Sequence, residues 1–312
     1  MIVDIGAGLD RHALRQLSAR SDARGTLQLC AHLALLGGTG TLIWLTLGGA
    51  MLAPALLLHG IAVNFLFCPL HETVHGTAFA SRRLNQAVSS ICGWVLLLPP
   101  HYFRLFHFAH HQFTQNPDQD PELAVSKPTS IAGYAWHVSG LPNWYNRLRI
   151  TLGHALRGQV KQPFVPPAKH RAVIREARTL WAGYLSALAA SIMLKRADLL
   201  MYWLIPLILG QPFLRAFLLA EHTGCDLGED GFSNTRTTRT NLAVRILTWR
   251  MSFHAEHHLH PSVPFFRLSE VRRLMAAQLP AATPGYIAFH RQLLRKLRFR
   301  KPSKCWTTDS GA

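Results

Sequence analysis

Histidines at helical spacing are the most unusual chemical feature of this 312-residue sequence. One pair lies in HETVH, and two groups, HFAHH and HAEHH, share the pattern HxxHH. Residues three or four apart share a helix face, whereas neighbours point about 100° apart, so an HxxHH group can address two different ions. Together with the histidine of EHTG, the predicted metal ligands are His71, His75, His107, His110, His111, His222, His254, His257 and His258.

These nine imidazoles exceed what one metal ion usually accepts and suit two ions. Imidazole binds iron, zinc, copper and nickel, so the ligand type alone does not choose the metal. Ligating imidazoles commonly donate their second N–H to a carboxylate. Six of the 16 acidic residues lie in or beside the clusters, and we predict that Asp120 and Glu256 in particular orient the rings; the other four are Glu72, Asp118, Glu122 and Glu221.

Two other classes of protein fit part of this pattern. HETVH satisfies HExxH, in which two histidines bind zinc and the glutamate is the general base of a protease. That interpretation leaves both HxxHH groups and His222 without a role. A metal transporter is a second alternative, although transporter ligands normally lie near the bilayer midplane within spans. Metal content separates these alternatives, since a protease needs one zinc.

The elements that must position the histidines are apolar helices. The sequence predicts an all-α integral membrane protein with a single membrane domain over residues 1–312 and spans at about 27–47, 51–70, 179–194 and 199–220. Short connections pair these spans into two hairpins. The metal-site regions, 71–178 and 221–312, are predicted to form a helical cap that holds the dimetal site.

The distribution of charge predicts the orientation. Of 33 basic residues, 4 precede the first span, 12 lie between the second and third, and 14 follow the fourth. Because Lys and Arg near span ends stay on the cytoplasmic side, both termini and the metal site are predicted to be cytoplasmic. The net charge of +17 is spread over these segments without a nucleic-acid motif, so we expect anionic membrane lipid and no nucleic acid as its partner.

The order HETVHGT, HFAHHQFTQNPDQDPE, EHTG, NTRTT and HAEHHLHPSVPF resembles the membrane fatty acid desaturase and hydroxylase superfamily, in its bacterial acyl desaturase branch. The resemblance implies that the nine histidines hold two irons. It also implies O2 as a co-substrate, a bacterial inner membrane location, and activation of an unreactive C–H bond of an apolar acyl substrate. Desaturation is the leading reaction; the alternatives are hydroxylation, ketone formation and oxidative decarboxylation.

The electrons for such a reaction must come from outside the chain. The sequence has no haem-binding HPGG segment, no cysteine quartet for an Fe–S cluster and no GxGxxG nucleotide loop. The two metals must therefore perform the redox chemistry, which zinc does not. We expect a separate electron donor, a ferredoxin or similar reductase.

Two features of the sequence bear on the substrate. Related sequences often carry Trp-Asn-Met before the last histidine group, whereas Arg250 occupies the middle position here, which leaves Asn241 as one possible replacement ligand. Aromatic residues near the clusters are candidates for lining the substrate route, against the alternative of interfacial anchors. They are Trp94, Tyr102, Phe103, Phe106 and Trp249.

Overall fold

The protein is built from helices, as the sequence predicts. The computed structural model describes residues 9–228 and 230–299, and within these it contains no strand, only an isolated bridge between Thr238 and Thr283. The longer helices are α1 Arg11–Leu17, α2 Asp22–Leu45, α3 Leu52–Asn64, α4 Phe67–His75, α5 Arg82–Val95, α6 Pro100–Phe113, α7 Ile131–Val138, α8 Leu141–Leu152, α9 His170–Met193, α10 Ile205–His222, α11 Leu242–Leu247, α12 His254–Leu259, α13 Leu268–Leu274 and α14 Tyr286–Phe299. The short turns are η1 Pro121–Ala124, η2 Gly153–Arg157, η3 Pro167–Lys169, η4 Leu200–Leu204 and η5 Phe265–Arg267.

Three helical stretches are long and apolar enough to cross a membrane: Asp22–Leu45, Leu52–His75 and Leu200–His222. They overlap the predicted spans 27–47, 51–70 and 199–220, but the last two continue further along the chain than predicted. His71, His75 and His222 therefore lie in the final turns of candidate spans rather than beyond them, because their helices do not end where the apolar run ends.

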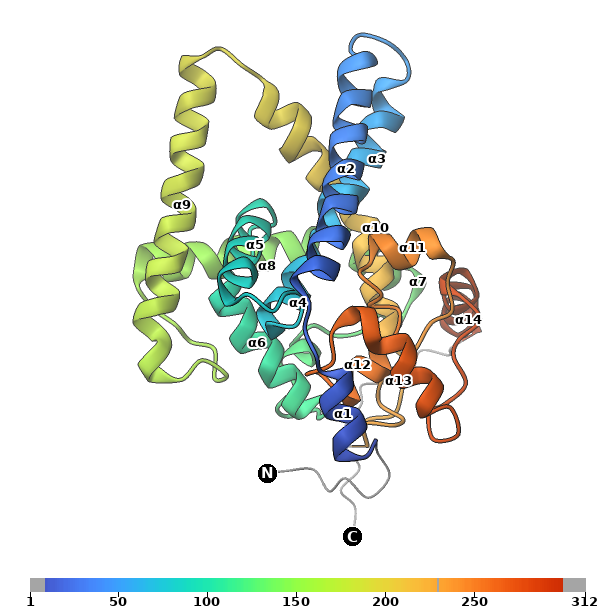
Figure 1. The fold of residues 1–312 in the computed structure, drawn as a ribbon. Coiled ribbons are helices and arrows are strands. Elements are labelled where there is room, and N and C mark those ends of the chain that lie inside the picture. The colour runs from blue at the N-terminus through green and yellow to red at the C-terminus, as the bar shows by residue number, and fades with distance from the viewer. Residues whose placement is uncertain (1–8, 229, 300–312) are drawn as a thin grey trace.

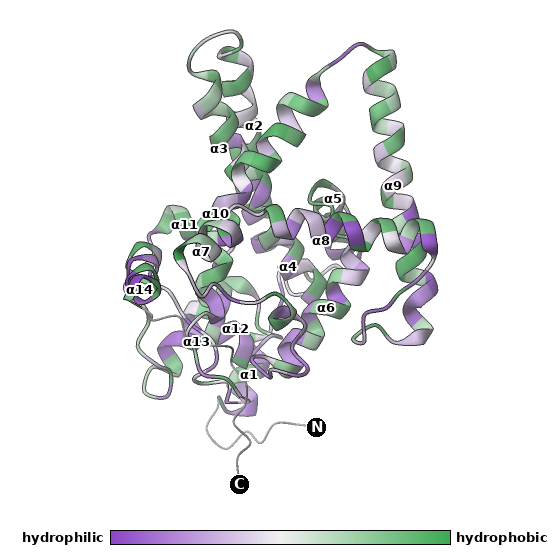
Figure 2. Ribbon diagram, turned by 180° about the vertical axis from the view of Figure 1, so that it is seen from behind, coloured by the Kyte–Doolittle hydropathy of each residue, from purple (hydrophilic) through white to green (hydrophobic). Residues whose placement is uncertain are grey.

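The predicted span 179–194 has a different setting. It forms the second half of α9, which begins nine residues earlier and carries exposed arginines in its first half. This helix is not among the three that are apolar enough to be candidates. Figure 1 nevertheless shows α9 extending toward the top of the view, as α2 and α3 do, and Figure 2 shows hydrophobic residues along all three.

The close crossing of α3 and α10 fixes two of the site-bearing segments relative to each other. A Cβ atom at Gly210 would lie 2.0 Å from the Gly60 carbonyl oxygen, so only glycine allows the backbones to approach this closely. Asn64 joins the helices by donating to the carbonyls of Gly60 at 2.8 Å and Leu207 at 3.0 Å. Small residues and interhelical polar contacts are typical of helix pairs in membranes.

The main hydrophobic core lies at the junction of α4, α5, α6 and α10, and the fully buried Trp249 from the α11–α12 connection belongs to it. Gly76 ends α4 in the left-handed conformation, with φ 73°, and turns the chain toward α5. Pro100 at the first turn of α6 starts the helix that carries HFAHH. These elements place the histidine-bearing ends of α4, α6, α10 and α12 in one region (Figure 1).

Candidate metal centre

The nine predicted histidines converge from four helices into two neighbouring sets. Within each set, one nitrogen of every ring lies within 4.8 Å of the others. The first set, called set A, takes two rings from α4, two from α6 and one from α12; the second, set B, takes one each from α6 and α10 and two from α12. Set A is His71, His75, His107, His111 and His257, and set B is His110, His222, His254 and His258.

Adjacent residues of each HxxHH group separate into different sets. His110 belongs to set B and His111 to set A, and likewise His258 belongs to set B and His257 to set A. This is the division that a rotation of about 100° per residue predicts. The ring centroids of His111 and His258 lie only 4.1 Å apart, so the two sets adjoin.

The Nε2 atoms approach one another in a way that hydrogen bonding alone does not satisfy. In set A, His107 Nε2 is 2.8 Å from His75 Nε2 and 3.0 Å from His111 Nε2. In set B, His222 Nε2 is 3.2 Å from His110 Nε2 and 3.1 Å from His254 Nε2. One imidazole nitrogen has either one proton or one lone pair, so it cannot serve two such neighbours fully. A cation that accepts all the lone pairs fits this arrangement.

Two further observations fit a metal. Both ring nitrogens of His71 are buried without a hydrogen-bond partner among the described residues, at 1% residue exposure. Burial, together with repulsion from neighbouring imidazoles, holds the pKa of His107, His111, His257 and His258 well below the usual value. These rings are therefore neutral near pH 7, which is the form that ligates metals.

In three of the four rings of set B, the other ring nitrogen contacts oxygen atoms that fix the tautomer; His254 Nδ1 is buried without a hydrogen-bond partner among the described residues. His110 Nδ1 lies 2.9 Å from Asp120 Oδ1 and 3.3 Å from Glu122 Oε2. His222 Nδ1 is 3.2 Å from the Asn234 carbonyl oxygen, and His258 Nδ1 is 3.1 Å from Thr114 Oγ1. A ring that donates through Nδ1 leaves the lone pair on Nε2 for a metal.

Asp120 lies where the sequence predicts an orienting carboxylate. The carboxylate also accepts the backbone N–H of Gln115 at 2.8 Å and that of Glu122 at 2.9 Å, which folds the loop after α6 back onto His110. Burial lowers the pKa of His110, but Glu122 and Asp120 outweigh burial, so the net pKa is raised. Without a bound cation, these carboxylates favour the protonated ring.

Glu256 has a different environment from Asp120. It is fully buried, but it accepts a hydrogen bond from Thr237 at 2.5 Å and lies 3.4 Å from Arg272 Nη1. These contacts anchor α12 from behind, since residue 256 is about 200° around the helix from His254. Although Glu256 directly precedes His257 in the sequence, its carboxylate contacts Thr237 and Arg272 and does not lie against the imidazoles.

Two further carboxylates near the imidazoles are among the six that the sequence places in or beside the histidine clusters, but the sequence did not favour them over Asp120 and Glu256. Glu122 lies beside His110 and forms an ion pair with Lys127 at 3.3 Å. Glu221 Oε2 lies 3.6 Å from His254 Nε2. The available signals were the spacing of Asp120 and Glu122 in DQDPE and the position of Glu221 directly before His222.

Neither Arg250 nor Asn241 contacts a site imidazole among the described residues. Arg250 has φ 60°, and its guanidinium donates to the Phe266 carbonyl at 2.9 Å. Asn241 caps α11 by accepting the Val244 N–H at 2.9 Å. The prediction that Asn241 is a replacement metal ligand is therefore wrong, because its side chain caps the start of α11.

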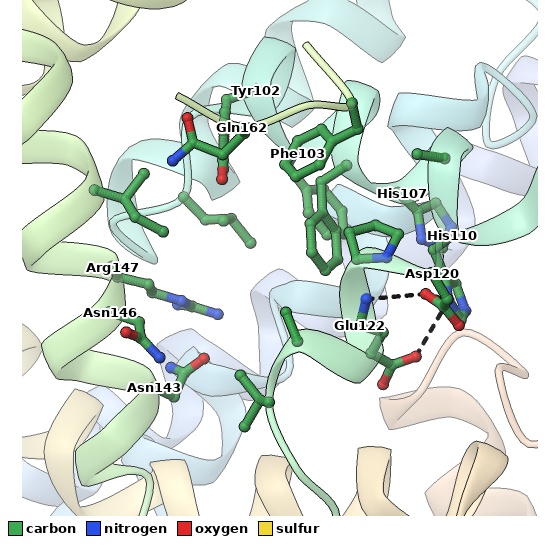
Figure 3. Close-up of a pocket in the computed structure, with 18 of the residues that line it drawn as sticks. Tyr102, Phe103, His107, His110, Asp120, Glu122, Asn143, Asn146, Arg147 and Gln162 are labelled. Atoms are coloured by element: carbon green, nitrogen blue, oxygen red, sulfur yellow. Dashed lines mark hydrogen bonds and ion pairs between the residues drawn. The ribbon is translucent and has the colours of Figure 1, made fainter. Parts of the chain in front are cut away.

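A cavity of about 1130 Å³ opens beside the candidate metal centre. His71, His107, His110 and His254 line one part, and Tyr102, Phe103 and Phe106 contribute apolar walls. The first three of these histidines lie on α4 and α6, and Figure 3 shows His107 and His110 next to Asp120 and Glu122. Of the five aromatic residues predicted to line the substrate route, these three line this cavity, whereas Trp94 and Trp249 pack elsewhere.

A helical protein with candidate membrane spans, two adjoining imidazole sets and a cavity with aromatic walls against them has the architecture of a membrane oxidoreductase. The chain belongs to the fatty acid desaturase family, whose model matches residues 42–290. This confirms the resemblance drawn from the histidine groups and makes the protein an enzyme, an oxidoreductase.

Relatives within the family catalyse different reactions. The chain is 21% identical over 245 residues to dihydrorhizobitoxine desaturase of Bradyrhizobium elkanii, covering 74% of this chain and 68% of the relative. It is 23% identical over 241 residues to an sn-1 oleoyl-lipid 12-desaturase of Picosynechococcus, covering 70% and 67%. It is 25% identical over 213 residues to a beta-carotene ketolase of Paracoccus, covering 66% and 73%. These identities leave the reaction of this chain open.

Proposed function

We propose that this enzyme is an O2-dependent di-iron oxidoreductase that introduces a double bond into a fatty acyl or other long apolar chain. The observation that carries the proposal is the division of nine imidazoles into adjoining sets of five and four beside a cavity that has an aromatic wall. Asp120 and Glu256 are proposed to position the ligand helices, the first through His110 and the second through α12.

The protein's own residues would bind and orient the reactants. Phe103, Phe106 and Leu98 line the cavity and would hold an apolar chain while excluding water. Asp120, Thr114 and the Asn234 carbonyl would keep the Nε2 lone pairs of three set B rings, His110, His258 and His222, directed inward. Two irons bound by the imidazoles would supply the reduction of O2 and the oxidising power for C–H cleavage.

The overall reaction requires an electron donor. Conversion of a CH2–CH2 unit to CH=CH with O2, two electrons and two protons yields two molecules of water. We propose that a separate ferredoxin or similar reductase provides both electrons. The net charge of +17 favours an acidic donor, and electrostatic docking of that kind would make the rate of electron delivery fall as salt is added.

We also propose the membrane arrangement predicted from the sequence. The second half of α9 would form a fourth span, making two hairpins, and the histidine-bearing helix ends would form a cytoplasmic cap at a bacterial inner membrane. The whole chain would act as one domain. The exposed apolar side chains Leu185, Leu188 and Ile192 on α9 support lipid contact there.

Hydroxylation, ketone formation and oxidative decarboxylation remain the alternatives, and the match to a ketolase favours keeping them. The zinc protease alternative is less consistent with the site. A zinc protease would need Glu72 as its general base. Glu72 is buried, and its carboxylate already accepts hydrogen bonds from Thr77 at 2.9 Å and from the Phe265 N–H at 3.4 Å. Product analysis after expression with a matched reductase distinguishes the oxidative reactions.

Metal analysis of the purified protein is expected to give about two irons per chain, because imidazole suits iron and there are two ligand sets. Chelation should abolish turnover, and iron should restore it. The measurement is elemental analysis by mass spectrometry alongside the activity assay. One zinc per chain with proteolytic activity would overturn the proposed function.

Asp120→Ala is expected to weaken metal binding in set B by about 10- to 100-fold, because His110 loses the carboxylate that orients it. Iron content should fall toward about one per chain, while set A keeps its ion. Asp118→Ala is the matched control, since that carboxylate is exposed in the same loop. Equal iron content in both variants would contradict the assigned role of Asp120.

A further inference from the structure

The cavity has two walls of opposite charge. The wall at the imidazoles carries Asp120, Glu122 and Glu221, whereas the wall formed largely by α8 carries basic and amide side chains. Figure 3 shows Arg147, Asn143 and Asn146 across the cavity from His110, Asp120 and Glu122, with Arg147 directed into the space. An apolar substrate alone would not need the basic wall.

The basic side chains extend from the mouth of the cavity to its interior. Arg149, Arg157 and Lys161 are exposed where they line it, whereas Arg215 is partly buried and Arg147 is 9% exposed. Among the described residues, none of these five forms an ion pair with a carboxylate. Such a gradient attracts an anion to the mouth and holds it further in.

Arg147 has unused hydrogen-bonding capacity in this cavity. Its Nη1 donates to the Leu96 carbonyl at 2.6 Å, at the carboxyl end of α5. A guanidinium has five N–H donors in a planar fork, which suits bidentate binding of a carboxylate or phosphate. A buried cation without an anionic partner is costly, so a bound anion would offset that cost.

Neighbouring groups are arranged for the same ligand. Arg215 Nη1 donates to Asn143 Oδ1 at 3.2 Å, which directs the Asn143 amide. The Asn143 Nδ2 and Arg215 Nε donors are both buried without a partner among the described residues. Both side chains line the cavity. The site thus presents several unsatisfied donors, as an anionic oxygen ligand requires.

We propose that the substrate carries an anionic headgroup, a carboxylate or a phosphate, which Arg147, Arg215 and Asn143 bind while the apolar chain extends toward the imidazoles. The proposal deepens the proposed function and rests on it for the role of the cavity as a substrate site.

The test is equilibrium binding of three probes with the same chain: hexadecanoate, hexadecyl phosphate and hexadecanol. The full-length, metal-loaded protein in phosphatidylcholine nanodiscs is titrated at pH 8 and followed by tryptophan fluorescence, with empty nanodiscs subtracted. At least one anionic probe is expected to bind about 10- to 100-fold more tightly than the alcohol. The stronger of the two identifies the headgroup as a carboxylate or a phosphate. Equal binding of all three would overturn the proposal.

Variants separate a binding role from a structural one. In Arg147→Gln the preference for the anion should disappear while hexadecanol binding is kept; Arg175→Gln, exposed on α9 outside the cavity, should retain the preference. If Arg147 serves only to cap α5 and its variant does not fold, Arg215→Gln provides the same comparison. A preference that survives in a folded Arg147→Gln or Arg215→Gln protein would refute the assignment. Because no turnover is measured, failure of the proposed reaction would leave this result unaffected.

Discussion

His257→Ala is expected to abolish product formation while leaving the protein folded and inserted. His257 lies in set A, with its Nε2 3.1 Å from His111 Nε2, and is 2% exposed. Loss of an outer hydrogen-bond partner of a metal ligand typically costs about 10- to 100-fold, so loss of a ligand should cost more. Product formed per minute and iron per chain are the measurements.

His260→Ala is the matched control for this experiment. His260 ends the same helix, and its Nε2 lies 3.3 Å from the Met275 sulfur rather than in either imidazole set. Circular dichroism and detergent gel filtration report whether each variant is folded. Turnover by a folded His257→Ala protein would rule out the ligand assignment, as would equal inactivation of the His260 variant.

Gly210→Ala is expected to destabilise the helix pair that connects the spans to the metal centre. Its new Cβ would meet the Gly60 carbonyl oxygen at 2.0 Å and Asn64 Nδ2 at 2.6 Å. Since the first neighbour is backbone, α3 and α10 must separate, and overpacking of this kind costs about 1–3 kcal/mol. The separation should also move His222 away from set B and lower the iron content.

Gly37→Ala on α2 is the control, because a Cβ at that position meets nothing within 4 Å. Alanine there should leave stability unchanged or raise it slightly, since alanine favours helix more than glycine does. Thermal inactivation rates and iron content measure the two effects. A Gly210→Ala protein as stable as the Gly37 variant would show that the helices can be separated without cost.

Much of the site could be predicted because its chemistry is encoded locally. Spacings of three and four residues place imidazoles on one helix face, and two adjacent histidines necessarily point in different directions. The histidine groups therefore indicated nine converging residues and two ions, and the structure brings all nine together. Their order along the chain also indicated the family that the comparison confirms.

Features that depend on contacts between distant segments could not be predicted in the same way. Asp120 lies nine residues after His111 and Glu256 directly precedes His257. Yet of the two carboxylates only that of Asp120 contacts an imidazole, because helix rotation and the fold of the loop after α6 decide which atoms meet. The lengths of α4 and α10 beyond the apolar runs placed His75 and His222 inside candidate spans, since packing extends a helix past its hydropathy signal.

By itself, the sequence determined which residue types recur at helical spacing, and hence the candidate metal ligands, the helical class and the family. Only the tertiary structure decided how the rings divide between sets A and B, which oxygens fix their tautomers, and that Arg147 and Asn143 face them across a cavity. The physical reason is range: helix periodicity acts over a few residues, whereas the cavity walls come from α6, α8 and α10, which only packing brings together.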